Sequence, residues 1–142
     1  MKNFMLLRVP ALSKSEAFVR NAVAAFSIEL DPTLDQLEDI KMAVSEAVTN
    51  CVVHAYEGKT RGEIEIYCEI ILNEMNIRIT DYGKGIKNID EALTPYFTTD
   101  THEERAGIGF TVMRSFMDDL NIKNNEYGGL TVYMRKNLIK ED

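Results

Sequence analysis

The sequence predicts an α+β fold, a two-layer sandwich with helices on one face of a mixed, largely antiparallel sheet. Three observations lead to this prediction. Apolar residues alternate with polar ones along 63–70 and again along 75–80, and the short Asn73-Glu74 step between them is typical of a hairpin. Helical spacing of apolar residues dominates 13–55. Helices grouped between antiparallel hairpins favour a helix-on-sheet sandwich over a doubly wound parallel fold.

The first third of the chain predicts one strand and two helices. Phe4–Val9 is a short strand that ends at a proline, which cannot donate to a strand ladder. Ser13 followed by Glu16 matches a capping box and predicts that a helix begins there and continues to about residue 30. After Asp31-Pro32, a longer helix is predicted over 33–55, with a glycine beyond its end at position 58.

The remainder predicts a long irregular segment, one helix and a second hairpin. Residues 81–109 are rich in glycine, proline and threonine and have little periodicity, and a loop of this length inside a domain is typical of a functional segment. A third helix is predicted over 108–117, then strands over 120–124 and 130–136 joined across two glycines.

Composition limits the classes of function. With 142 residues and 45% hydrophobic content, we expect residues 1–142 to form one domain. A formal charge of −7 argues against direct nucleic-acid binding. Cys51 and Cys68 lie in apolar segments far from any C-x-x-C spacing, so both are predicted to be buried free thiols. The N-terminus lacks the pattern of a signal peptide or membrane span, and we expect a cytoplasmic protein.

Three polar residues interrupt the second helix at intervals of four. Glu46, Asn50 and His54 fall within an arc of about 80° that borders the apolar stripe. Such half-desolvated groups need a partner, which a ligand can provide. They can also be ordinary solvent-facing residues of an amphipathic helix, and for His54 we favour a structural hydrogen bond over a catalytic role.

Two glycine motifs accompany this helix. Asp81-x-Gly83-x-Gly85 follows a strand, where an aspartate can accept a hydrogen bond from the exocyclic amine of adenine. Gly107-x-Gly109 is predicted to open the third helix, where free N–H groups and the helix dipole favour phosphate. Each motif alone is weak evidence, because the first is more often an ordinary turn and the second can simply satisfy tight packing.

In this order, the motifs resemble the N box and glycine boxes of the ATP-binding fold shared by gyrase, Hsp90, histidine kinases and MutL. The match includes Glu46, Asn50 and His54-Ala55, both glycine motifs, and Gly129-Leu130-Thr131. It spans almost the whole chain. The expected absence of further domains, together with HAYEGK at 54–59, resembles the anti-sigma serine kinases of Gram-positive bacteria, most closely those of spore formers.

The resemblance implies a role for each matching residue. Asn50 would supply a side-chain oxygen to Mg²⁺, and Glu46 would be the general base for an incoming serine hydroxyl. Asp81 would bind the adenine amine, supported by Thr131 directly or through water. Members often carry two threonines after the last glycine, and Leu130 replaces the first here.

The remaining nucleotide contacts would come from the two glycine motifs and from a lid. Gly83 and Gly85 would give room for ATP or ADP, and Gly107, Ile108 and Gly109 would surround the phosphates. Residues from about 86 to 106 would form the lid, in which Arg105 would pair with the terminal phosphate. An exposed arginine without a ligand is the alternative.

The resemblance also implies protein partners. Such kinases inhibit a sporulation sigma factor of the sigma-F type and phosphorylate a serine of its antagonist, the anti-anti-sigma factor. Glu16 and Arg20 are candidate partner contacts, and a solvated ion pair at helical spacing is the favoured alternative. A homodimer is expected, with the sheet edge near Phe4–Val9 as a possible interface.

Three alternatives remain open. One is a general-stress kinase of the sigma-B type. Another is a sequestering module that binds ATP without catalysing transfer. The third is an ATPase or a catalytic fragment of a histidine kinase, which is disfavoured because we expect no phosphoacceptor helix in the chain.

Overall fold

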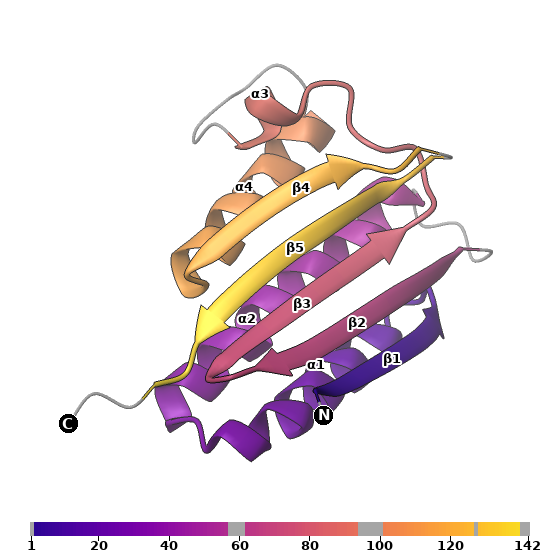
Figure 1. Cartoon of the computed structure of the whole chain (residues 1–142). Helices are drawn as coiled ribbons and strands as arrows, with labels where there is room; N and C mark the ends of the chain where they lie inside the picture. Colours follow the sequence, from indigo (N-terminus) through magenta and orange to yellow (C-terminus); the bar gives the residue numbers. More distant parts are fainter. Residues whose placement is uncertain (1, 57–61, 94–100, 127, 140–142) are drawn as a thin grey trace.

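Five strands form one sheet, and the helices cover one of its faces (Figure 1). The computed structural model describes residues 2–56, 62–93, 101–126 and 128–139, and of residues 101–107 only the backbone. In sequence order the strands are β1 (Asn3–Pro10), β2 (Glu63–Ile71), β3 (Glu74–Asp81), β4 (Asp119–Asn124) and β5 (Leu130–Asn137). The strand order is β1-β2-β3-β5-β4 and all four pairings are antiparallel, so the predicted α+β class is confirmed without any parallel pair among the described strands.

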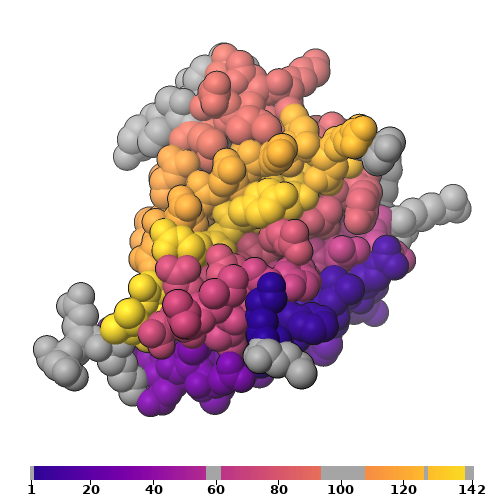
Figure 2. Space-filling view, in the orientation of Figure 1, coloured from indigo at the N-terminus to yellow at the C-terminus, as the bar shows by residue number. Residues whose placement is uncertain are grey.

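The helices pack in a layer with α2 at its centre. In sequence order the helical elements are α1 (Ser15–Ser27), η1 (Ile28–Leu30), α2 (Leu34–Asn50), η2 (Cys51–Ala55), α3 (Ile89–Leu93) and α4 (Thr101–Phe116). Helix α2 contacts both α1 and α4. Figure 2 shows the opposite face of the sheet, where the strands themselves form the surface and none of the described helices covers them.

Strand alternation decides which side chains enter the core. In β2 the even-numbered positions from Ile64 to Ile70 are buried, while the odd-numbered ones face the open side. Cys51 and Cys68 are both buried free thiols, as predicted. Side chains also alternate in β3, where the odd-numbered positions are buried. Asp81 therefore lies on the helix-covered face, in line with Ile77 and Ile79.

The capping box lies at a different helix from the one predicted. The Ser13 side chain does not cap α1; instead Ser15 Oγ donates to the Pro10 carbonyl at 2.7 Å and ties the helix to the end of β1. Thr33 and Gln36 form the box at α2, with hydrogen bonds of 3.0 and 3.1 Å. The prediction for Ser13 was wrong because Ser13 lies in the turn before α1, where its carbonyl accepts from the Glu16 backbone N–H.

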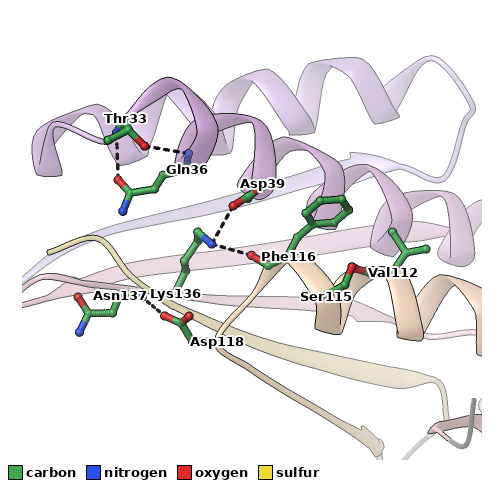
Figure 3. Close-up of polar contacts among 9 residues, drawn as sticks. All are labelled: Thr33, Gln36, Asp39, Val112, Ser115, Phe116, Asp118, Lys136 and Asn137. Carbon is green, nitrogen blue, oxygen red and sulfur yellow. Dashed lines mark hydrogen bonds and ion pairs between the residues drawn. The ribbon is translucent and has the colours of Figure 1, made fainter. Parts of the chain in front are cut away.

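A buried lysine joins the two layers at the end opposite Asp81 (Figure 3). Lys136 of β5 is 8% exposed, and its Nζ donates to Asp39 Oδ2 of α2 at 3.2 Å and to the Phe116 carbonyl at 2.7 Å. The carbonyl belongs to the last residue of α4, where a cation is favoured by the helix dipole. Lys136 therefore holds α2 and the end of α4 against the sheet.

The segment predicted to be irregular is partly helical. Asn88 Oδ1 accepts from the Glu91 N–H at 3.1 Å and starts the short α3. Helix α4 begins at Thr101, seven residues before the predicted start, because residues 102–106 are nearly all good helix formers with acidic residues in the first turn. The lid predicted over about 86–106 thus includes α3 and the first turns of α4; its residues 94–100 lie outside the described part, as does Gly58.

Thr33→Ala is expected to lower the free energy of unfolding by about 1 kcal/mol, because it removes the side-chain acceptor of the α2 cap. The matched control is Ser13→Ala, which removes an exposed hydroxyl that caps no helix and should change stability by less than about 0.5 kcal/mol. Urea denaturation of both variants checks this. Equal losses, or a larger loss for Ser13→Ala, would contradict the assignment of the cap.

Candidate functional site

A cavity opens between the C-terminal part of α2, the π-helical turn η2 and the ends of β3 and β5. Its lining combines apolar core residues with polar groups from four segments of the chain. The lining residues are Ala47, Asn50, Cys51, His54, Ala55, Asp81, Lys84, Gly85, Ile86, Phe110, Leu130 and Val132. Four of the predicted site or border residues, from α2, η2 and the β3 end, therefore meet at one place: Asn50, His54, Asp81 and Gly85.

Asp81 is the buried acidic group of this cavity, with 3% of its surface exposed. Its Oδ1 accepts from the backbone N–H groups of Gly83 at 3.0 Å and Leu130 at 3.2 Å. Its Oδ2 accepts from the Cys51 thiol at 3.7 Å. Burial raises the pKa of the Asp81 carboxyl, and these three hydrogen bonds offset part of the rise. The carboxylate is held in place by one oxygen while the other lies beside a cavity-lining thiol.

Two glycines allow the backbone contacts that fix Asp81. A Cβ at Gly83 would overlap the Ala55 carbonyl at the end of η2. A Cβ at Gly129, which has φ of +90°, would overlap the Asp81 carbonyl. The end of η2, the end of β3 and the start of β5 can therefore approach one another this closely only because these two positions are glycine.

Asparagines before β5 complete the turn after Asp81, and sequence reasoning missed them. Asn124 binds Ile86 twice, accepting from its N–H at 3.1 Å and donating to its carbonyl at 2.8 Å. Asn125 Nδ2 donates to the Asp81 carbonyl at 2.9 Å. The adjacent asparagines ahead of the two glycines were the available signal, because asparagine side chains commonly bind backbone groups in turns.

The end of α2 is held to the turn after Asp81 by a tyrosine. Tyr56 follows η2, and its hydroxyl accepts from the Tyr82 N–H at 2.6 Å and donates to the Glu63 carbonyl at 2.7 Å. The five-residue π-turn shifts the helix register just after Asn50, a device that often occurs at functional sites.

Asn50 carries an unsatisfied buried amide. Its Nδ2 has no hydrogen-bond partner among the residues that the structure describes. Gly109 of α4 lies against it, since a Cβ there would come within 2.8 Å of that nitrogen. Leaving a buried amide unpaired costs about 1–3 kcal/mol, and a polar ligand in the cavity would recover this energy. The amide and the Asp81 carboxylate thus fit a ligand with both acceptor and donor groups.

Glu46 lies one turn before Asn50 on α2 and is half-buried, outside the lining of the cavity. Burial raises the pKa of its carboxyl. Within the described ranges no hydrogen bond or ion pair engages this side chain. A desolvated, unengaged carboxylate can serve as a proton acceptor near the cavity.

The structure does not bring Thr131 into the cavity. Strand alternation turns Leu130 and Val132 inward, whereas Thr131 pairs with Thr80 on the other face, their hydroxyls 3.1 Å apart. The Thr131 hydroxyl donates to Asn125 Oδ1 at 2.6 Å and so connects to Asp81 only through the Asn125 amide. Its support of a base contact stays a prediction.

The second glycine motif does not open a helix. Gly107, Ile108 and Gly109 lie inside α4, so the prediction that they open the helix is wrong, while their contact with phosphate stays a prediction. The physical reason is the helix-forming run before them, together with the close packing of Gly109 on Asn50. Ile108 is 58% exposed, and the side chain of Arg105 lies outside the described part.

Glu16 and Arg20 form an ion pair on α1, with Oε1 and Nη1 3.2 Å apart. Neither residue lines the cavity. The ion pair at helical spacing is therefore present, although both residues are half-buried instead of fully solvated, and a role in partner binding stays a prediction.

Among residues 2–56, 62–93, 101–126 and 128–139, no group of three or more His, Cys, Asp or Glu side chains is placed to hold a metal ion. Over the same ranges, each helix is too short or too polar to span a membrane.

Known proteins are similar to this chain in sequence and in fold. Residues 9–136 match the sequence model of a protein family, the histidine kinase-like ATPase domain. The anti-sigma F factor of Caldanaerobacter subterraneus is 49% identical over 134 residues, covering 94% of this chain and 93% of that protein. The anti-sigma F factor of Anoxybacillus flavithermus is 48% identical over 140 residues, covering 99% and 96%.

Solved structures show the same fold at low identity. The nucleotide-free catalytic domain of the histidine kinase ThkA superposes with a TM-score of 0.60 at 14% identity, covering 96% of each chain. The chain belongs to the histidine kinase-like ATPase family and, within it, to the anti-sigma F factors. Membership in an ATPase family implies that the chain binds a nucleotide.

Asp81→Asn is expected to maintain or raise the free energy of unfolding at neutral pH. Because the pKa of Asp81 is raised in the folded state, ionisation of its carboxyl opposes folding. The stabilising contribution of the protonated carboxyl is fully present below the ordinary carboxyl pKa of about 3.9, and it is lost as the pH rises through the raised pKa. The asparagine oxygen can still accept from both backbone N–H groups. Urea denaturation at pH 7 and at about pH 4 checks this. A variant less stable than the wild type at pH 7, with the deficit vanishing in acid, would contradict it.

Proposed function

We propose that this chain is an anti-sigma factor and a serine protein kinase. It binds and inhibits a sporulation sigma factor of the sigma-F type, and it uses Mg·ATP to phosphorylate a serine of its anti-anti-sigma antagonist. The observation that carries the proposal is the convergence of the Asp81 carboxylate and the unpaired Asn50 amide on one cavity. The near full-length relatives named anti-sigma F factor support the partner assignment.

Each end of the nucleotide has a counterpart in the site. Asp81 accepts a hydrogen bond from the adenine amine, which guanine lacks at the equivalent position. Gly83 and Gly85 give the nucleotide room beside the backbone of this turn. Thr131 supports Asp81 through Asn125. Asn50 would hold Mg²⁺ through its side-chain oxygen, and the ion would supply positive charge that stabilises the phosphates. Gly107, Ile108, Gly109 and Arg105 contact the phosphates.

Phosphate-binding by the second glycine motif requires a rearrangement of α4. Inside a helix, a backbone N–H is engaged by the carbonyl four residues earlier. Release of the first turns of α4 frees these donors for the phosphates, and each interior glycine lowers the energy needed by about 1 kcal/mol relative to alanine.

Glu46 acts as the general base. Its carboxylate takes the proton of the serine hydroxyl as the serine oxygen attacks the γ-phosphorus and ADP departs. Its raised pKa brings the carboxylate closer to the working pH, which favours proton transfer.

Protein partners bind outside the cavity. Glu16 and Arg20 of α1 contact the sigma factor or the antagonist. The chain forms a homodimer through the edge strand β1, whose Phe4 and Leu6 side chains are 60% and 58% exposed. The protein acts in the cytoplasm.

One observation favours a second candidate function. Glu46 is not part of the cavity lining, as a sequestering module that binds ATP without transferring phosphate would allow. Incubation with labelled ATP, Mg²⁺ and a candidate anti-anti-sigma protein separates the two. Phosphoserine on the antagonist supports the kinase, and nucleotide binding without transfer supports the module.

Asp81→Asn is expected to weaken ATP binding by about 10- to 100-fold, because a charge-assisted hydrogen bond is replaced by an amide donor facing the adenine amine. Asp119→Asn is the control, since Asp119 lies on β4 and is exposed. Calorimetric titration with Mg·ATP measures both. Equal affinities for the wild type and Asp81→Asn would remove the base-recognition role.

Glu46→Gln is expected to reduce phosphotransfer by about 100-fold or more while ATP affinity changes by less than about threefold, because only the proton acceptor is removed. Glu38→Gln, on the same helix with a 67% exposed side chain, should leave both unchanged. Single-turnover phosphorylation and nucleotide titration provide the two readouts. Undiminished transfer in Glu46→Gln would exclude the general-base role.

A further inference from the structure

The nucleotide cavity contains a buried thiol that the proposed mechanism does not use. Cys51 is the first residue of the π-turn η2 and is 3% exposed. It lines the cavity together with Asp81, and its Sγ lies 3.7 Å from Asp81 Oδ2. A thiol is a weak donor and a carboxylate oxygen is a strong acceptor, so the hydrogen bond runs from Cys51 to Asp81.

The two oxygens of Asp81 are held differently. Oδ1 accepts from two backbone N–H groups, of Gly83 and Leu130, which side-chain substitutions do not remove. Among the described residues the Cys51 thiol is the sole donor to Oδ2. Because the two oxygens turn together about the Cβ–Cγ bond, the N–H groups on Oδ1 and the thiol on Oδ2 restrain the same rotation, and the thiol adds a side-chain restraint to the backbone ones.

Oδ2 has lone-pair capacity beyond the thiol. A carboxylate oxygen accepts two hydrogen bonds, and the thiol uses one. The second direction is available to an N–H donor in the cavity that both side chains line. The thiol therefore holds the carboxylate in the orientation in which Oδ2 can meet a ligand donor.

We propose that Cys51 is a positioning residue that sets the preference of the site for adenine over guanine by orienting Asp81. The inference rests on the proposed role of Asp81 in base recognition. An oriented carboxylate accepts from the amine of adenine and repels the carbonyl oxygen that guanine presents at the same position. A carboxylate held through Oδ1 alone, with more freedom to turn, does both less well.

The chain offers a matched control. Cys68 is also a buried free thiol, 0% exposed, but it lies in β2 and does not line the cavity. Valine replaces a thiol with a similar volume and no donor, whereas serine keeps a donor. Comparing Cys51→Val, Cys51→Ser and Cys68→Val therefore separates the hydrogen bond from the loss of a buried thiol in general.

Calorimetric titrations with Mg·ATP and Mg·GTP test the inference. Cys51→Val is expected to bind ATP about 3- to 10-fold more weakly and to lower the ratio of ATP to GTP affinity by a similar factor, the scale of one net hydrogen bond. Cys51→Ser should stay within about twofold of the wild type, and Cys68→Val should not change either affinity.

A measurement on the wild type gives a second readout. Infrared difference spectra of the S–H stretching band, assigned with Cys51→Ser and Cys68→Ser, should show that ATP shifts the Cys51 band and leaves the Cys68 band in place. This readout does not require Cys51→Val to fold.

Opposite results would overturn the inference. They are an unchanged ATP-to-GTP ratio in Cys51→Val, an equal loss in Cys51→Ser and Cys51→Val, or a Cys51 band that does not respond to ATP. Failure of the proposed function looks different: the wild type then binds no ATP, or Asp81→Asn binds it as well as the wild type. If Asp81→Asn loses ATP while Cys51→Val does not, only the role of Cys51 is lost.

Discussion

The site depends on a backbone contact among three chain segments at the end of β3. Gly83 lies against the Ala55 carbonyl where η2 ends, and Gly129 lies against the Asp81 carbonyl where β5 begins. A side chain at either glycine would push these segments apart. The contact places the Gly83 and Leu130 N–H groups on Asp81 Oδ1, so the buried carboxylate owes its position to the absence of two Cβ atoms.

The two-layer fold brings the helix residues to this point. Helix α2 lies on the sheet with α1 and α4 beside it, and its last residue, Asn50, reaches the β3 end because the strand and the helix are of similar extent. The π-turn then moves Cys51 beside Asp81. At the opposite end, Lys136 fixes α2 and α4 to β5. The Lys136 contacts and the cavity thus lie at opposite ends of the sheet.

Local patterns predicted much of this structure. Alternation at 63–70 gave the correct inward face of β2, and the helical pattern correctly placed Glu46 and Asn50 on one helix, whereas His54 lies in the π-turn that follows it. Placement of Asp81 at a strand end was also predictable, because its strand ends where glycines begin. These features follow from periodicity and turn chemistry within about ten residues.

Other features depend on contacts between distant segments and could not be read locally. Ser13 matched a capping box, but the contact of Ser15 with Pro10 fixed a different helix start. Gly107 and Gly109 looked like a helix start, although the second packs on Asn50 from inside α4. Thr131 was assigned to the site, yet pairing with Thr80 turns its hydroxyl to the open face. The roles of Asn124 and Asn125 required knowing that β4 ends beside Asp81.

A backbone ¹⁵N NMR titration with Mg·ADP tests the central claim most directly, since it reports where on the fold a nucleotide acts. The predicted result is that the largest amide shifts occur at Cys51, Gly83 and Leu130, which surround Asp81. Amides of Tyr67 and Tyr133, on the uncovered face of the sheet, should remain in place. Shifts concentrated on that uncovered face, or none at all at saturating nucleotide, would contradict the convergence of helix and glycine turns on one nucleotide cavity.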